Sequence, residues 1–121
     1  MIVLDYPPAL NSHWRVWKGR ILVSAKSRAY KLAAQIRAAS MGVRPLQGEL
    51  SVTLHFYRPQ KSGDLDGRLK VLFDCMNGVL WVDDAQVVEI HAFRHEDKKR
   101  PRVEVETMVL GATSDAPRKR A

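Results

Sequence analysis

The chain has 121 residues, which is the length of one domain and enough to bury a hydrophobic core. Its 20 Lys and Arg residues against 13 Asp and Glu residues give a net charge of +7, which favours a polyanionic partner such as nucleic acid. The single cysteine excludes an intramolecular disulfide, and neither a signal peptide nor an apolar run of about 20 residues is found. We therefore expect a cytoplasmic protein with no membrane segment.

The first third of the chain predicts two short strands and a helix. Residues 2–6 and 21–23 are the strands, and the polar, aromatic and basic segment 11–20 between them suits a loop or a short ribbon. Ser24 can cap a helix over 25–41, which would stop at Gly42. The residues expected on the core face of this helix are Tyr30, Ala33, Ala34 and Ile36.

The middle of the chain shows two clear periodicities. Residues 50–57 alternate between apolar and polar, which predicts a strand with one buried face. From Leu65, apolar residues recur at positions 65, 69, 72, 73 and 76, which predicts an amphipathic helix that ends at Asn77-Gly78.

Segments 87–93 and 102–109 read as strands, and we expect them to form a closing hairpin around a polar loop. The sequence of elements predicts an α+β fold, with two helices packed on a small mixed or antiparallel β-sheet. We expect one folded domain over residues 1–110, followed by a disordered basic tail over 111–121.

Two aspartates in the stretch GDLDGRLK stand out in this basic chain. Asp64 occupies the N-cap position of the second helix and Asp66 lies in its first turn, so capping and the helix dipole alone could explain both. Asp66, Lys70 and Asp74 follow one another at i, i+4 spacing beside the apolar face. These three residues could form a row of surface salt bridges, or they could line one side of a catalytic site.

A second acidic pair, Asp83 and Asp84, follows in LWVDDAQVV, where apolar neighbours should hold it near the domain body. Carboxylates within a positive surface are typical of a site for a hard divalent cation such as Mg²⁺, which binds oxygen ligands and phosphate together. Lys70 is placed to stabilise a charged transition state. The pattern indicates metal-dependent phosphodiester hydrolysis.

The N-terminal segment combines aromatic and basic residues. Trp14 and Trp17 could stack on unpaired bases, or could instead pack against the sheet edge. The residues expected to contact DNA are Asn11, Trp14, Arg15, Lys18, Arg20 and Lys70.

Four motifs, PPALNSHWR, VSAKSRAYK, DLDGRLKVLFDCMNG and LWVDDAQVVE, follow one another over nearly the whole chain, to about residue 109. In their order and spacing they resemble the RusA-type Holliday junction resolvases, small endonucleases of bacteria and phages that cut four-way DNA junctions. The third motif departs from the family pattern at Gly67, where an asparagine is common.

The resemblance implies that Asp64, Asp66 and Asp84 are catalytic and bind the metal, with Asp83 beside them and Lys70 as a functional lysine. It also implies Mg²⁺ as cofactor, with Mn²⁺ as a substitute, and a homodimer that makes paired symmetric nicks during DNA recombination and repair. Two alternatives stay open: a nuclease of the same fold that cuts flaps or forks, and a DNA-binding module without catalysis.

Overall fold

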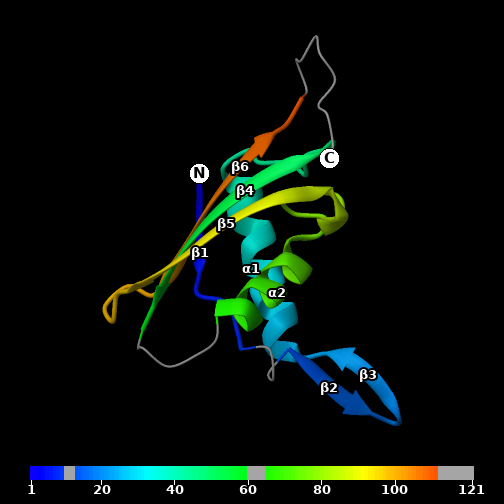
Figure 1. Cartoon of the computed structure of the whole chain (residues 1–121). Helices are drawn as coiled ribbons and strands as arrows, with labels where there is room; N and C mark the ends of the chain where they lie inside the picture. Colours follow the sequence, from blue (N-terminus) through cyan, green and yellow to red (C-terminus); the bar gives the residue numbers. More distant parts are fainter. Residues whose placement is uncertain (10–12, 60–64, 112–121) are drawn as a thin grey trace.

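The computed structural model describes residues 1–9, 13–59 and 65–111, and for residues 14–17 it describes the backbone alone. The elements, in chain order, are β1 (Ile2–Asp5), β2 (Trp14–Trp17), β3 (Arg20–Val23), α1 (Ala25–Ser40), β4 (Leu50–Arg58), α2 (Leu65–Met76), the short 3-10 helix η2 (Asp84–Gln86), β5 (Val87–Glu96) and β6 (Arg102–Val109) (Figure 1). The prediction of an α+β fold with two helices on a small sheet is confirmed.

The main sheet has four strands in the order β1-β6-β4-β5, and β2 pairs only with β3 in a separate ribbon. Strand β5 runs parallel to β4, with α2 as the crossover between them, whereas β6 is antiparallel to both β4 and β1. The sheet is therefore mixed, as the sequence allowed.

The predicted hairpin between the last two strands is wrong, because β4 lies between β5 and β6. Two strand spacings amount to about 10 Å, and a five-residue connection reaches up to about 16 Å. The connection over residues 97–101 is therefore long enough to pass the end of one strand. Strand β4 takes the central position because its inward side chains, Leu50, Val52, Leu54 and Phe56, are all 0% exposed.

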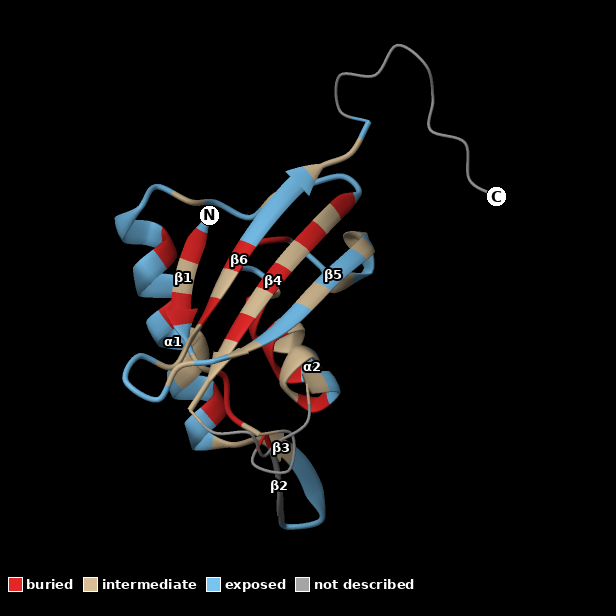
Figure 2. Cartoon of the chain, turned by 60° about the vertical axis from the view of Figure 1, so that its left-hand side comes forward, coloured by how far each residue is buried: buried red, intermediate tan, exposed pale blue. Residues whose placement is uncertain are grey.

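Both helices cover the same face of the sheet, and the buried residues lie between the two layers (Figures 1 and 2). The apolar face predicted for α2 is confirmed, since Leu72 and Met76 are fully buried and Leu65, Leu69 and Phe73 are partly buried against the core. Val71, which the prediction left out, is also fully buried. On the opposite face, the alternate residues of β4 are only partly buried. No helix in the described ranges is both long enough and apolar enough to cross a membrane.

Helix α1 begins as predicted, because the Ser24 hydroxyl accepts a hydrogen bond from the Ser27 amide at 3.2 Å. The predicted core face is only partly right, since Ala33 is exposed and Ile36 is 63% exposed, while Ala34 and Ala38 are buried. Positions 34 and 36 differ by about 200° around a helix. Ala34 and Ala38 therefore face the interior, and Ile36 faces solvent.

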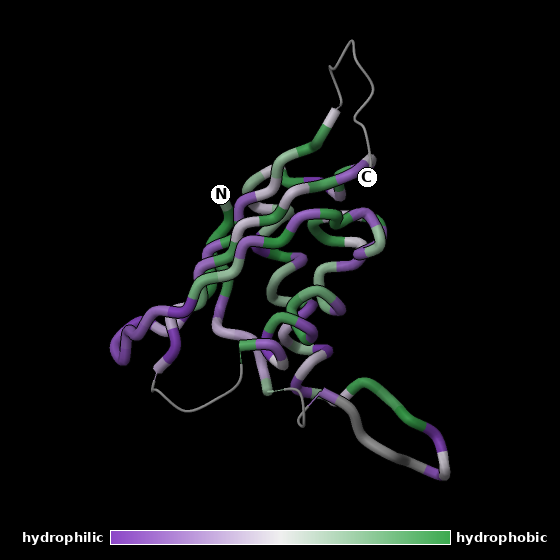
Figure 3. Tube along the Cα trace, in the orientation of Figure 1, coloured by the Kyte–Doolittle hydropathy of each residue, from purple (hydrophilic) through white to green (hydrophobic). Residues whose placement is uncertain are grey.

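The β2–β3 ribbon projects away from the two-layer body (Figures 1 and 3). Its strands pair from Trp14 opposite Val23 to Trp17 opposite Arg20. Lys18 and Gly19 form the turn with φ of 50° and 73°, the positive values that a tight two-residue hairpin turn requires.

Candidate active site

A cavity of about 580 Å³ lies beside α2, at the edge of the sheet formed by β5. Its described lining residues are His13, Leu69, Lys70, Phe73, Asp74, Asp84 and Ile90. They come from three parts of the chain that only the fold brings together. The cavity combines an apolar wall with two carboxylates, one lysine and one histidine, which is a combination suited to binding and chemistry.

Helix α2 contributes a row of charged residues at one-turn spacing. Asp66 is exposed in the first turn, Lys70 follows one turn later, and Asp74 follows after another. The i, i+4 spacing places all three on one side of the helix, over a length of about 12 Å. The opposite side of the helix is buried in the core. Lys70 and Asp74 therefore reach the cavity because the apolar face fixes the rotation of the helix.

His13 is 2% exposed and joins two helices by hydrogen bonds. Its Nε2 lies 2.7 Å from Asp74 Oδ2, and its Nδ1 lies 2.7 Å from the hydroxyl of the fully buried Ser27 of α1. Because a carboxylate only accepts, Nε2 carries the proton, and in the neutral ring the Ser27 hydroxyl donates to Nδ1. The His13 carbonyl also accepts from the Ser24 amide at 2.7 Å. The residue thus connects the base of the ribbon, α1 and Asp74.

The loop after α2 is anchored by Trp81, whose side chain is 0% exposed and whose ring lies edge-on to Phe73 at 5.1 Å. The Trp81 indole N–H donates to Asn77 Oδ1 at 3.0 Å. Downstream, Gln86 Nε2 donates to the carbonyl groups of Leu46 and Gly48, at 2.9 and 2.8 Å. These contacts fix both ends of the loop that carries the acidic pair.

The two aspartates of this pair are in different environments. Asp83 is exposed and caps the η2 helix: its Oδ1 accepts from the Ala85 amide at 3.2 Å, and its own amide donates to Gln86 Oε1 at 2.9 Å. Asp84 is partly buried and lines the cavity. The Asp83 side chain therefore stabilises the start of the η2 helix, whereas the Asp84 side chain lies at the cavity.

The pKa of Asp84 is raised above its ordinary value. Partial burial is the largest cause, followed by a hydrogen bond with the Asp83 side chain and by the negative charges of Asp83 and Asp74, whereas a hydrogen bond with Asn77 opposes the shift. The carboxylates are thus close enough to repel one another.

The structure brings together only some of the residues predicted for the site. Lys70 and Asp84 line one cavity, while Asp66 lies a turn before Lys70 and Asp83 caps η2. Asp64 and Asn11 lie outside the described residues. Lys18 and Arg20 are exposed on the ribbon, and Trp14 and Arg15 belong to β2, of which only the backbone is described.

The residues present fit a divalent cation by their chemistry. Across residues 1–9, 13–59 and 65–111, no group of three His, Cys, Asp or Glu side chains is placed to hold a metal ion by itself. Mg²⁺, however, is commonly held by one or two carboxylates together with water and substrate phosphate. Mutual repulsion between Asp84 and its acidic neighbours is what a bound cation would relieve.

Comparison with known proteins identifies the family. Residues 5–108 match the family model described as endodeoxyribonuclease RusA. The chain belongs to the RusA family. The resemblance of its four motifs is thereby confirmed.

Relatives within the RusA family align along almost the full chain. A crossover junction endodeoxyribonuclease RusA of Escherichia coli strain K12 is 31% identical over 114 residues, which cover 91% of this chain and 94% of the relative. The protein of the same name from Enterobacteria phage 82 is 31% identical over 113 residues, with the same coverage. The Shigella sonnei relative is 29% identical over 114 residues.

Sequence reasoning gave His13 no role and weighed Asp74 only as part of the charged row. They are 61 positions apart, and no periodic pattern connects them. The available signal was indirect: a histidine inside the first RusA motif, and an aspartate on the same stripe as Asp66 and Lys70. Only the packing of α1, α2 and the ribbon shows that they meet.

Proposed function

We propose that this protein is a Mg²⁺-dependent endodeoxyribonuclease that resolves four-way DNA junctions by paired nicks. The observation that carries the proposal is the cavity in which a RusA-family chain places Lys70, Asp74 and Asp84 side by side, with His13 holding Asp74. The names of the relatives support a crossover junction as the substrate.

We assign the metal-binding role to the carboxylates of Asp84, Asp66 and Asp64, with Asp83 orienting the loop that carries Asp84. When bound, Mg²⁺ would neutralise phosphate charge and activate a water for in-line attack. Lys70 lies one turn from Asp66 and lines the cavity with Asp84, so its ammonium group donates to the charged phosphoryl oxygens of the transition state. The bond from His13 keeps Asp74 from rotating toward that ammonium group.

The DNA-binding role belongs to the basic surface near the cavity. Lys18 and Arg20 are exposed on a ribbon that projects from the body, and His13 connects the base of that ribbon to the candidate active site. The net charge of +7 favours contact with several phosphates. Trp14, Arg15 and Asn11 precede the ribbon turn and are assigned to the same contact.

A four-way junction has two equivalent strands to cut, and we assign one cutting site to each chain. Two coordinated nicks therefore call for a homodimer whose two-fold axis matches that of the junction.

The test is cleavage of an end-labelled four-way junction with Mg²⁺, alongside a fork, a flap and a linear duplex. Paired nicks confined to the junction support the proposal. Cutting of the fork or flap at the same rate favours the broader nuclease, and a shifted but intact junction favours a DNA-binding module. Glu106→Gln, which removes an exposed carboxylate on β6, is the control for general loss of negative charge.

A further inference from the structure

A second cavity, of about 310 Å³, lies at the opposite edge of the sheet, between α1, β1 and the connection that joins β5 to β6. Tyr30 and Arg37 line it from α1, Asp5 lines it from β1, Arg100 lines it from the connection, and Arg102 lines it from the start of β6. Figure 3 shows this connection as strongly hydrophilic. No motif considered in the sequence points to this cavity.

Two of its three arginines form no ion pair with a described residue. Arg102 forms ion pairs with Asp97 at 2.9 Å and with Glu104 at 3.1 Å. Within the part of the chain that the structure describes, Arg37 and Arg100 form no ion pair. Asp5 contributes one negative charge to the lining, so the cavity is positive on balance.

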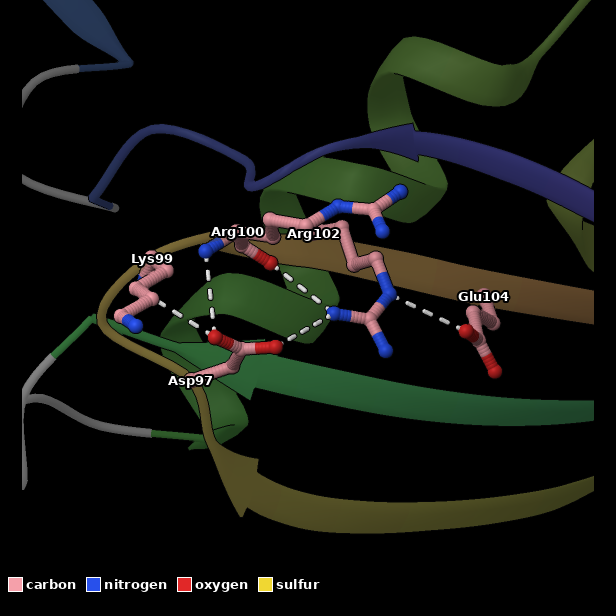
Figure 4. Close-up of polar contacts among 5 residues, drawn as sticks. All are labelled: Asp97, Lys99, Arg100, Arg102 and Glu104. Carbon is pink, nitrogen blue, oxygen red and sulfur yellow. Dashed lines mark hydrogen bonds and ion pairs between the residues drawn. The ribbon is translucent and has the colours of Figure 1, made fainter.

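The turn that carries Arg100 is held rigidly (Figure 4). Asp97 Oδ1 accepts from the amides of Lys99 and Arg100, both at 3.1 Å. The Arg102 Nη1 donates to Asp97 Oδ2 and to the Arg100 carbonyl, at 2.9 and 3.0 Å. Its guanidinium also lies 3.8 Å from the centre of the Tyr57 ring.

As a result, the Arg100 side chain leaves the turn on the side away from Asp97, toward the cavity (Figure 4). Opposite it, the Tyr30 hydroxyl donates to the Asp5 carbonyl at 2.5 Å, and burial raises the pKa of Tyr30, so the Tyr30 side chain stays uncharged. The guanidinium groups are thus presented before any ligand arrives.

We propose that this cavity binds a backbone phosphate of the junction, remote from the phosphate that is cut. Paired guanidinium groups match the oxygens of a phosphate in charge and geometry. The edge strands β1 and β5 are three spacings apart, or about 14 Å. The phosphate bound here is therefore a different one from the phosphate at the candidate active site. The inference rests on the proposed function, because it presupposes a DNA substrate.

The experiment measures junction affinity against salt for the full chain and for Arg37→Gln/Arg100→Gln, by fluorescence anisotropy in EDTA to prevent cutting. Each phosphate contact contributes about −0.9 to the log–log slope, so losing the one contact proposed here should make the slope of the double variant shallower by about 0.9. If the two lines meet at 1 M salt, that difference corresponds to about 8-fold weaker binding at 0.1 M salt. Arg37→Lys/Arg100→Lys keeps both charges and should keep the slope, and Arg44→Gln removes an exposed arginine outside the cavity and should change the slope little.

A parent-like slope and affinity in the double Gln variant would overturn the inference while leaving junction cleavage by the parent intact. If the parent protein itself shows neither cleavage nor salt-dependent binding, the proposed function fails instead. A third arm titrates inorganic phosphate into labelled protein. If free phosphate shifts the Arg100 resonances while the double variant binds the junction like the parent, the cavity takes a small anion and the DNA assignment is wrong.

Discussion

The buried histidine gives a sharp prediction about stability, because it supports two neighbours at once. Replacing His13 by alanine removes the partner of the Ser27 hydroxyl, which is 0% exposed, and leaves a void where the ring lay. An unsatisfied buried hydroxyl costs about 1–3 kcal/mol. The void adds about 2 kcal/mol, at the low end for large-to-small changes in a core. The Asp74 side chain, on the other side of the ring, is 40% exposed, so water can take the place of the His13 Nε2–H donor. Loss of the bond to Asp74 therefore adds little to the destabilisation.

We therefore expect His13→Ala to lower the free energy of unfolding by about 3–5 kcal/mol, a large part of the 5–15 kcal/mol that is usual for a domain. Urea unfolding followed by tryptophan fluorescence measures the change. With an m value of about 1–3 kcal/mol/M, the midpoint should fall by about 1 M or more while m stays constant. Asp74→Asn, as the matched control at the exposed end, should cost less than about 1 kcal/mol.

A loss below about 1 kcal/mol in His13→Ala would refute this reasoning. A cycle with Ser27→Ala sharpens the test, since the double variant should lose less than the sum of the two single changes. Strict additivity would mean that the two side chains do not interact as described.

Three further predictions concern charge and assembly. The pKa of Asp97 is lowered, first by its bond from the Arg100 amide and then by Arg102, so its carboxyl signal in NMR should titrate below 3.8. Because the pKa of Asp97 is lower in the folded protein than in the unfolded chain, Asp97 stabilises the fold at a pH above its unfolded pKa, and this stabilisation is lost as the pH falls through its folded pKa. A titration midpoint of the Asp97 carboxyl signal at or above 3.8 would contradict the hydrogen bonds described for the turn. Light scattering without DNA should give about twice the chain mass of 13.7 kDa, and a strict monomer that binds the junction as one copy would exclude paired nicks. Truncation before Arg118 should alter the salt slope of junction binding only slightly, because most of the +7 charge lies before it; a collapse of the slope would place the contact in the tail.

The secondary structure was predictable where apolar spacing is regular. The alternation in β4 and the 3.6-residue repeat in α2 each leave one way to bury the apolar side chains, and both elements form as expected. The position of α1 around its axis was not predictable from hydrophobicity. In α1 the close packing of the helix on its neighbours leaves room for the small side chains of Ala34 and Ala38, and the larger Ile36 side chain lies on the exposed face.

Strand order and the site depend on contacts between distant parts of the chain. A five-residue connection fits a hairpin and also fits a step across one strand, so nothing local placed β4 between β5 and β6. Local motifs marked Lys70 and Asp84 as candidates, because acidic and basic residues gather there in the sequence. The role of His13 emerges only when α1 and α2 pack together and close it off from solvent.

The central claim is that the carboxylates of Asp64, Asp66 and Asp84 support Mg²⁺-dependent cutting of the junction. One experiment tests this claim most directly. The rate of nicking of a labelled four-way junction is measured against Mg²⁺ concentration for the parent, Asp66→Asn and Asp84→Asn, with junction affinity measured separately in EDTA. Each substitution removes a proposed metal ligand and one negative charge that repels phosphate. The account predicts that both variants nick more than about 100-fold slower and bind the junction as tightly as the parent or more tightly. Nicking by either variant at close to the parent rate would contradict it.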